Sequence, residues 1–252
     1  MTKLTAIILT YNEAEHIEAC IQSLAFADAC IVFDSFSTDE TVTLAKAAGA
    51  TIIQHVFENF SAQRNAALDA IAGQSEWVLF VDADERVPDD LAQEILNVIQ
   101  DDNYVAYQIP RYNYIFGKLT QGAGWYPDYQ TRLLKVGFTH YENLVHEIVV
   151  LDGERGTLEH HFIHYNYKDL SQFLQTQRKY TRYEAEIMHR EGIKPKPQNY
   201  ILQPLRHFRW RFIELKGYRE GWHGLRLCIL MSWYELQKYL ILRRLWQGTA
   251  AS

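Results

Sequence analysis

Carboxylate side chains directly follow one of the apolar segments of the chain. Asp82 and Asp84 are separated by Ala83, and Glu85 comes next. Alternating carboxylates that leave a strand at its carboxyl end can present oxygens to one divalent cation, and Mg²⁺ or Mn²⁺ prefers such ligands beside substrate phosphates. A helix N-terminus that collects acids to suit its dipole is the alternative. The position directly after a strand favours the metal site.

A second group of polar residues follows the first apolar run, residues 4–9. It consists of Thr10, Tyr11, Asn12 and Glu13. The segment lacks the glycine pattern that brings a backbone against a dinucleotide pyrophosphate. A tyrosine ring can stack on a base, and Asn and Glu side chains can bind a ribose or a base edge. An ordinary strand-to-helix turn with an Asn cap explains the same residues, so this segment alone leaves both interpretations open.

A third polar segment, residues 34–39, contains Asp34 and Asp39 and again follows an apolar run. Solvated turns would explain each of the three polar segments separately. They would not explain why all three follow strands, whose carboxyl ends meet at one edge of a parallel sheet. We therefore expect a ligand site at that edge.

Strands and helices are expected to alternate through the first hundred residues. The expected strands are 4–9, 30–33, 51–55 and 77–81. Helices are expected at 15–24, 61–72 and 88–99, and Ser61 is expected to cap the second of these. A further helix, capped by Thr38 or Asp39, is expected to end at Ala48. This alternation predicts an α/β fold with a mostly parallel sheet flanked by helices.

Beyond residue 100 the pattern loosens. Strands are expected at 104–110 and 130–135, and the segment between them, 113–128, is rich in Gly and aromatic residues and is expected to be a long loop. A helix is expected at 168–191, and a helical tail at 200–246 with a break at 217–224. We expect one α/β domain, residues 1–165, and a helical C-terminal region, residues 166–252.

Composition narrows the function. The 252 residues carry 25 Lys and Arg against 31 Asp and Glu, and this acidic excess argues against a general nucleic-acid binder. The three cysteines are dispersed, which excludes a disulfide scaffold and a four-cysteine zinc site and suits a reducing cytosol. No uncharged apolar run approaches the roughly 18–20 residues of a membrane-spanning helix, and the N-terminus lacks a signal-peptide pattern. The protein is expected to be cytosolic, or to lie on a membrane without crossing it.

The charge is divided unevenly along the chain. Residues 199–252 hold nine Lys and Arg against three Asp and Glu, a net charge of +6, whereas residues 1–198 carry −12. Arginines and tryptophans are interleaved in this tail, which is typical of an amphipathic helix at an anionic membrane surface. Helices packed on the body or on another subunit are the alternative. Interleaved aromatic and basic residues also suit RNA binding, but nothing else in the chain indicates that function.

The polar segments together resemble the family 2 glycosyltransferases of the GT-A fold, a Rossmann-like α/β fold. The resemblance covers roughly residues 1–100 and is carried by four segments: Thr10–Glu13, Asp34 with Ser37, Asp39 and Thr41, then Gln63-Arg64-Asn65, and Asp82-Ala83-Asp84. Later segments resemble the branch of β-glucosyltransferases that acts on the lipopolysaccharide inner core. They are residues 125–132, which read Trp-Tyr-Pro-Asp-Tyr-Gln-Thr-Arg, Val145-His146-Glu147, and the aromatic, basic tail.

The resemblance implies a UDP-sugar donor, with glucose as the expected sugar, and an Mg²⁺ or Mn²⁺ ion. It implies that the nucleoside is held by Thr10, Tyr11, Glu13 and Asp39, and that Arg64 lies near the base or phosphates. It also implies that Asp82 binds the ribose or the metal and that Asp84 binds the metal. The same donor-binding segments include Asn12, Asp34 and Ala83. A cation at the diphosphate would stabilise the charge that builds up when the leaving group departs.

The resemblance also implies inversion at the anomeric carbon, which needs one carboxylate to accept the proton of the acceptor hydroxyl. Glu147 and Asp128 are the candidates. Glu147 is favoured because it follows the apolar Leu144 and Val145, and its neighbour His146 is a candidate metal or phosphate ligand. The expected acceptor is the lipopolysaccharide core or another glycolipid, at the inner face of the cytoplasmic membrane.

Three alternatives are weighed against this interpretation. A polyprenyl phosphate acceptor is already anionic and would need no general base. A non-catalytic GT-A scaffold would not need the intact Asp82 and Asp84. A zinc site at His160, His161 and His164 is not expected, because the spacing of the last two fits a helix better than a strand and no Cys or acid cluster completes it.

Overall fold

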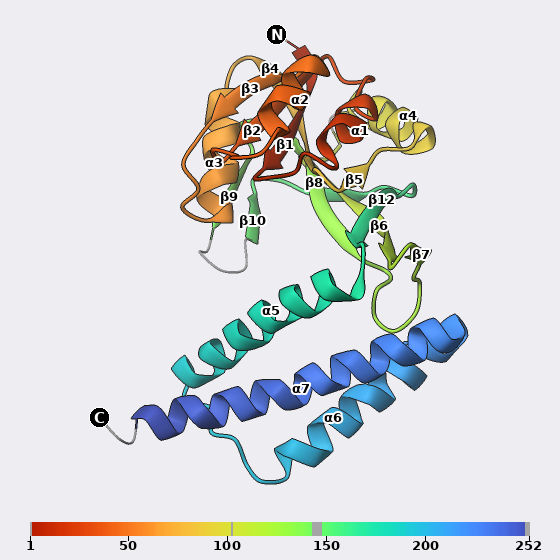
Figure 1. The fold of residues 1–252 in the computed structure, drawn as a ribbon. Helices are drawn as coiled ribbons and strands as arrows, with labels where there is room; N and C mark the ends of the chain where they lie inside the picture. The colour runs from red at the N-terminus through yellow and green to blue at the C-terminus, as the bar shows by residue number, and fades with distance from the viewer. Residues whose placement is uncertain (1, 102, 143–147, 250–252) are drawn as a thin grey trace. The chain divides into compact units, whose positions relative to one another are not determined.

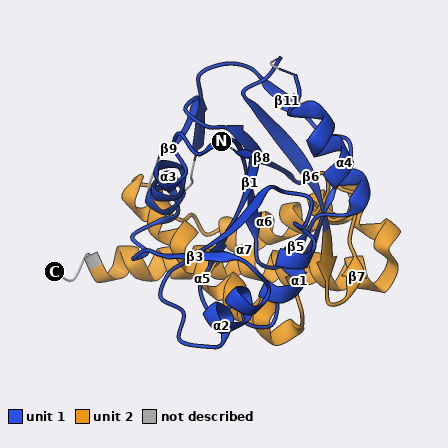
Figure 2. Cartoon of the chain, turned by 90° about the horizontal axis from the view of Figure 1, so that it is seen from above, with its two compact units in different colours: residues 1–112, 128–164 blue, residues 113–127, 165–252 orange. Residues whose placement is uncertain are grey.

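The computed structural model describes residues 2–101, 103–142 and 148–249. Backbone contacts group the chain into two compact units, shown in blue and orange in Figure 2. Unit 1 comprises residues 1–112 and 128–164, and unit 2 comprises residues 113–127 and 165–252. Grouping by contacts does not show that either unit folds alone, so the division into domains 1–165 and 166–252 stays a prediction.

Four parallel strands begin the sheet of unit 1, in the order β3-β2-β1-β4 (Figure 1). They are β1 (Thr2–Thr10), β2 (Ala29–Asp34), β3 (Thr51–Gln54) and β4 (Ser75–Asp82). Thr10 lies beside Asp34 in the register of β1 and β2, and Leu9 lies beside Asp82 in that of β1 and β4. The three polar segments therefore leave the sheet at one edge, as the alternation of strands and helices predicted.

Four helices flank these strands, and they are α1 (Ile17–Gln22), α2 (Thr41–Ala47), α3 (Phe60–Ala70) and α4 (Asp89–Val98). One apolar cluster joins residues of α1, α2 and α4 to Trp77, Leu79 and Val81 of β4, and another joins α3 to Val78 and Phe80 of β4. Successive residues of a strand point to opposite faces, so the helices cover both faces of the sheet. The predicted α/β class is confirmed.

The cap of α3 differs from the prediction. Asn59, not Ser61, is the N-cap residue, and its side chain accepts a hydrogen bond from the backbone N–H of Ala62 at 2.9 Å. Asn59 is extended, with φ of −162°, whereas Ser61 already belongs to the helix. The side chain of Ser61 instead donates to the backbone carbonyl of Glu142.

Antiparallel strands extend the sheet beyond β4. β8 (Tyr129–Lys135) pairs with β4, and β6 (Ala106–Ile115) pairs with β8. The sheet continues through β12 (Phe162–Tyr167) to β5 (Glu85–Arg86), which is antiparallel to β12. Three short strands and one two-residue strand complete the set: β9 (Thr139–Glu142), β10 (Ile148–Leu151), β11 (Arg155–Thr157) and β7 (Lys118–Leu119).

The loop predicted at 113–128 is partly wrong. β6 extends to Ile115, and β7 pairs with its end across a turn at Phe116 and Gly117, both of which have positive φ. Tyr112, Tyr114 and Ile115 are aromatic or β-branched and suit a strand. The glycine content of the segment concealed this hairpin.

Unit 2 is mainly helical. Its elements are α5 (Leu170–Arg190), α6 (Asn199–Arg209), a π-helical turn η1 (Trp210–Glu214), a 3₁₀ turn η2 (Gly217–Glu220) and α7 (Gly221–Thr249). α7 packs against both α5 and α6 (Figure 1). The helical tail is interrupted at Lys216, whose backbone is left-handed with φ of 55°. α7 then begins at Gly221, within the break predicted at 217–224. Within the described part of the chain, no helix is long and apolar enough to cross a membrane.

Candidate active site

Asp34 holds the end of β2 to its neighbours. Its carboxylate accepts hydrogen bonds from the hydroxyl of Thr10 at 3.2 Å, from the amide N–H and hydroxyl of Ser37, and from the side chain of Gln54. Asp34 is fully buried and Thr10 is 4% exposed. The two side chains thus order the loop 34–39 from beneath, and the contact with a nucleotide that was assigned to them stays a prediction.

Asn12 locks the loop after β1 to the loop after β2. Its backbone N–H donates to the hydroxyl of Ser37 at 2.9 Å, and its side-chain oxygen accepts from the backbone N–H of Thr38 at 2.8 Å. Asn12 has a φ of 58°, a left-handed conformation that Asn tolerates better than most residues. Asn12 therefore holds the two candidate ligand loops together.

Asp39 makes a second joint between the same loops. Its carboxylate accepts from the backbone N–H of Ala14 at 3.2 Å and from the backbone N–H and hydroxyl of Thr41. The hydroxyl of Thr41 in turn accepts from the backbone N–H of Glu13 at 2.8 Å. The hydrogen bond from the Thr41 hydroxyl is the main cause that lowers the pKa of Asp39.

Two aromatic rings stand exposed on these joined loops. Tyr11 is 58% exposed and Phe36 is 51% exposed, although large apolar side chains are usually covered. Phe36 has a φ of 59°, which is uncommon for a bulky residue and is often found at functional sites. The pair offers flat apolar surface on which a base could stack.

Three guanidinium groups surround Asp82. Its carboxylate lies 2.5 Å from Arg132 Nη2, 3.6 Å from Arg64 Nη2 and 4.0 Å from Arg111 Nη1. Burial by itself raises the pKa of Asp82, but the guanidinium groups of Arg132, Arg64 and Arg111 outweigh this and lower it to about 2. Asp82 is therefore ionised and fixed at physiological pH, and one third of its side chain remains exposed.

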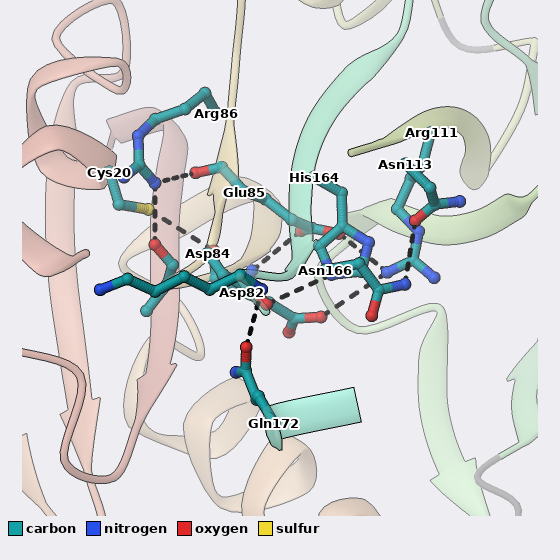
Figure 3. A network of polar contacts seen from close by, with 12 residues as sticks. Cys20, Asp82, Asp84, Glu85, Arg86, Arg111, Asn113, His164, Asn166 and Gln172 are labelled. Atoms are coloured by element: carbon teal, nitrogen blue, oxygen red, sulfur yellow. Dashed lines mark hydrogen bonds and ion pairs between the residues drawn. The ribbon is translucent and has the colours of Figure 1, made fainter. Parts of the chain in front are cut away.

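Glu85 and Asp128 are joined through Arg111 (Figure 3 shows Glu85 and Arg111). Arg111 Nη1 lies 3.0 Å from Glu85 Oε1, and Arg111 Nε and Nη2 lie 2.9 and 2.7 Å from Asp128 Oδ2. Glu85 is fully buried and also accepts the backbone N–H of Asp82 at 2.9 Å. Burial, followed by the charge of Asp82, raises the pKa of Glu85. Glu85 thus shapes the turn that carries Asp82, Ala83 and Asp84.

Asp84 faces a histidine that comes from a distant strand. Antiparallel pairing of β12 with β5 sets His164 beside Glu85, and His164 Nε2 lies 3.3 Å from Asp84 Oδ2 (Figure 3). Ala83, between the two aspartates, is 3% exposed, so the turn presents Asp84 rather than the methyl group. Asp84 keeps 31% of its side chain exposed, while His164 is nearly covered.

Glu13 reports that the acidic loops converge. Desolvation, followed by the charges of Asp84, Asp39 and Asp82, raises its pKa from 4.5 to about 7. Like charges raise a carboxyl pKa only at short range. The carboxylates on the loops after β1, β2 and β4 therefore act on one another electrostatically, and a cation nearby would relieve their repulsion.

The donor atoms fit a cation that also binds a substrate. In the described ranges, no three His, Cys, Asp and Glu side chains are placed to hold a metal ion. Asp84 and His164 supply one carboxylate and one imidazole, and a phosphate-bearing substrate would supply further oxygens. Mg²⁺ binds almost only through oxygen, whereas a transition metal such as Mn²⁺ also accepts imidazole. The pair fits Mn²⁺ better than Mg²⁺.

The other residues weighed from the sequence are two predicted candidates, His146 and Glu147, and three further histidines. His146 and Glu147 lie outside the described residues. His160 pairs with Glu94, Nδ1 to Oε2 at 2.9 Å, and the hydrogen bond from that side chain raises the pKa of His160. His161 stacks on the ring of Tyr112 with centroids 3.9 Å apart, and burial lowers its pKa. Of the three histidines, His164 alone contacts an acidic loop of the candidate site.

The sequence indicated no site role for Arg111, Arg132 or Phe36, and His164 was weighed only as part of a zinc site that was not expected. Arg111 and Arg132 lie on the antiparallel strands β6 and β8, and His164 lies on β12. A charged residue within a strand whose neighbours are buried is a usable signal, because such a charge needs a partner. His164 lacked this signal, because its neighbour Tyr165 is 44% exposed, and its partner could not be named without the register of β12.

The chain matches known proteins along most of its length. Residues 5–153 match the model of the family described as glycosyl transferase family 2. An uncharacterized glycosyltransferase of Rickettsia bellii is 30% identical over 209 residues, which make up 77% of this chain and 70% of that protein. The lipopolysaccharide core biosynthesis glycosyltransferase LpsC of Rhizobium meliloti is 24% identical over 263 residues, 96% of this chain and 94% of that protein.

Among solved structures, two complexes of glucosyl-3-phosphoglycerate synthase from Mycobacterium tuberculosis are similar. The complex with Mg²⁺ and UDP has a TM-score of 0.49 and 16% identity, and the match covers 78% of this chain and 81% of that one. The complex with Mn²⁺, UDP and phosphoglyceric acid has a TM-score of 0.37 and 22% identity, and the chain spans less than half of its length, 43%.

Proposed function

Since the chain belongs to glycosyltransferase family 2, we propose that it transfers a sugar, glucose, from a UDP-sugar to a lipopolysaccharide core acceptor. The α/β sheet with its helical extension is the GT-A arrangement expected of this family. LpsC supports the acceptor, because that protein is named for lipopolysaccharide core biosynthesis and matches nearly the whole chain. The observation that carries the donor site is that the loops after β1, β2 and β4, which bear Glu13, Asp39, Asp82 and Asp84, leave the sheet at one edge. The three aspartates also raise the pKa of Glu13.

The nucleoside is proposed to bind on the joined loops. Tyr11 and Phe36 would cover the base, since both rings are exposed there. Thr10, Asn12, Asp34 and Asp39 would act mainly by holding the loops, because their side chains already bond to each other or to loop backbone. Glu13 is the carboxyl that could bond a ribose or base, and a pKa near 7 lets it donate as well as accept.

The diphosphate is proposed to lie between Asp84 and the arginines. Asp84 and His164 would hold Mn²⁺, which when bound would offset the negative charge of the leaving nucleotide. Asp82 is already neutralised by Arg132 and Arg64, so it would orient ribose or arginine rather than bind the metal. Arg64 is held by the rings of Phe80 and Tyr141, at 5.0 and 5.5 Å, which limits its movement toward a ligand.

We propose Glu147 as the general base that takes the proton of the acceptor hydroxyl during inversion. Asp128 suits this role less well, because its carboxylate accepts hydrogen bonds from Arg111 Nε and from Gln130 and forms an ion pair with Arg111 Nη2. A carboxylate paired with arginine is a weaker base, since the guanidinium stabilises its ionised form. The arrangement favours Asp128 as a support for β6 and β8.

A panel of nucleotide sugars, read by release of the nucleotide with extracted core lipopolysaccharide as acceptor and Mn²⁺ present, tests the proposal. UDP release from UDP-glucose that depends on the acceptor is expected. Asp84→Ala should abolish it, and Glu76→Gln, a surface change far from the acidic loops, should not. No nucleotide release from any donor would refute the transferase proposal and favour the scaffold alternative.

The need for a general base distinguishes the polyprenyl phosphate alternative from the proposed function. That acceptor brings its own anionic oxygen, so Glu147→Gln would leave transfer to polyprenyl phosphate nearly unchanged. Transfer to a sugar hydroxyl should lose most of its rate in the same variant. Measuring both acceptors with one protein preparation decides between the two reactions.

A further inference from the structure

The outer face of α7 is apolar although it meets solvent. Trp222 is 76% exposed, Ile229 is 51% exposed and Trp233 is 53% exposed. Spacings of seven and four residues put the three side chains on one side of a helix. Leu227, Cys228 and Leu242 lie on the opposite side and are fully buried. α7 therefore has one apolar face that packs within unit 2 and a second that is left open.

α6 and η1 repeat this arrangement. Ile201, Leu205 and Ile213 are 67%, 61% and 56% exposed, and no residue of α6 is buried. Arg209 falls at the same four-residue spacing between Leu205 and Ile213, so cationic and apolar side chains share one face. Apolar side chains exposed on one face of a helix are typical of a surface that binds a partner or a membrane.

The acidic side chains of this region turn inward. Glu220 accepts the backbone N–H groups of Gln121 and Gly122, and Glu235 lies 2.8 Å from Lys238 Nζ. Both acids are less than 15% exposed, which leaves Glu214 as the exposed acid among the described residues after 198. Six of the nine cations in residues 199–252 are exposed, namely Arg206, Arg209, Lys216, Arg219, Arg243 and Arg244. Against the one exposed acid, Glu214, these six cations give the described tail a net surface charge of +5.

We propose that the outer faces of α6 and α7 are a docking surface for anionic lipid, on which the two helices lie in the plane of the headgroups. Tryptophan and arginine on one exposed helix face suit the boundary between headgroups and acyl chains. Since no described helix can span a bilayer, the helices lie on the surface. This inference rests on the proposed function for its purpose, since enzyme and glycolipid acceptor would then share one surface.

A second copy of the chain fits this surface less well. A two-fold contact brings the same patch of both copies together, so two surfaces of the same positive sign would meet. Like charges in contact oppose association. Anionic phospholipid supplies the opposite charge and the apolar layer at once.

Flotation of the full-length chain with vesicles tests the surface. Vesicles of phosphatidylcholine alone are compared with vesicles that also contain phosphatidylglycerol, at physiological ionic strength. The wild type should float with the anionic vesicles. Trp222→Gln with Trp233→Gln should weaken binding about ten-fold or more. Arg206→Gln with Arg209→Gln, which removes two exposed cations of α6, should weaken it about 30-fold on anionic vesicles, since each cation near such a surface is worth about five-fold.

Matched pairs on unit 1 serve as controls. Val56→Gln with Phe138→Gln removes two exposed apolar side chains, and Lys46→Gln with Arg155→Gln removes two exposed cations. Both control proteins should bind as the wild type does. Equal flotation of the Trp222/Trp233 variant and the wild type would overturn the proposal. The proposal would also be overturned if light scattering without vesicles showed a wild-type dimer that is lost in the Trp222/Trp233 variant.

Nucleotide release from UDP-glucose, measured on the same proteins without vesicles and with lipid-free core oligosaccharide as acceptor, separates this proposal from the proposed function. Release should be unchanged in the tryptophan and arginine variants. A wild type that releases UDP with this acceptor but does not float defeats the docking surface alone. A wild type that floats but releases no nucleotide in the presence of acceptor supports the docking surface and defeats the transferase proposal.

Discussion

His164 Nε2 lies 3.3 Å from Asp84 Oδ2 because β12 pairs with β5 in a register that sets His164 beside Glu85. A strand pairing, rather than a local motif, thus delivers an imidazole to the acidic turn after β4. Asp84 alone would be one of several carboxylates at this edge of the sheet. The contact with His164 distinguishes it from Asp82, whose nearest charged partner is Arg132.

His164→Ala should lower the affinity for Mn²⁺ in the presence of UDP by at least about ten-fold, because one of two protein ligands is lost. Titration calorimetry measures this. His160→Ala is the matched control, since His160 is exposed and pairs with Glu94 away from the acidic turn. Unchanged Mn²⁺ affinity in His164→Ala would show that the imidazole only supports Asp84.

Glu147→Gln should reduce the rate of transfer to core lipopolysaccharide about 100-fold or more, the range usual for loss of a general base. Binding of UDP should be unchanged, because the donor site is proposed to lie at the acidic loops. Steady-state kinetics and UDP titration of the same protein check both parts. A variant with full transfer rate would exclude Glu147 as the base.

Asp128→Asn should act mainly on stability. The change removes the charge that Arg111 pairs with, and a partly buried guanidinium is left with Glu85 and Asp82. We expect a loss of about 1–3 kcal/mol in the free energy of unfolding, measured in urea, and a smaller loss of activity than in Glu147→Gln. The opposite pattern, intact stability with abolished transfer, would make Asp128 the base.

The sequence predicted the donor-side loops because their signals are local. Thr10, Asp34 and Asp82 each end an apolar run long enough to be recognised as a strand, and parallel pairing then puts the strand ends at one edge. Their ligand roles remain proposals. Asp34 was expected to belong to a donor-binding segment, but its side chain is buried beneath the loop that follows β2.

The arginine side of the site was missed because it depends on long-range register. Arg111 and Arg132 belong to β6 and β8, which pair with a register shift between Tyr107 and Gln108 that no periodic pattern reveals. β5 and β7 have two residues each, too few for any period. The cap of α3 was misplaced by two residues for a local reason, since Asn59 and Ser61 both favour caps and only the backbone angle decides.

Glu85→Ala should destabilise the protein strongly. Glu85 is fully buried, pairs with Arg111 and accepts the N–H of Asp82. Breaking a buried pair from one side costs about 3–5 kcal/mol, because the other charge is left uncompensated. Glu85→Gln should cost less, since its amide oxygen can still accept one of the two hydrogen bonds, which fall on different oxygens of Glu85. Glu76→Gln, which breaks a surface pair with Lys3, should cost about 0–1 kcal/mol, and denaturant titration of all three variants checks the order.

Glu13 should make stability fall as pH rises, in protein freed of divalent cations. Its pKa is about 7 in the folded protein, raised by desolvation and by Asp84, Asp39 and Asp82, against 4.5 as the ordinary value. Below pH 4.5 the carboxyl is protonated in both the folded and unfolded states, and it adds no pH dependence. Between pH 4.5 and 7 the folded state holds the extra proton, so its stability relative to the unfolded state decreases with rising pH.

Glu13→Gln should therefore match the wild type near pH 4.5 and exceed it by about 2 kcal/mol above pH 7, a figure reduced for the partial exposure of the side chain. Urea unfolding across this range, with a chelator present, measures the difference. Asp84→Asn should shrink the difference, because the charge of Asp84 is the second cause of the raised pKa. Adding Mn²⁺ and UDP to the wild type should do the same if the cation binds beside Asp84. A difference that stays constant from pH 4.5 to 8 would mean that Glu13 does not lie among the converging carboxylates in solution.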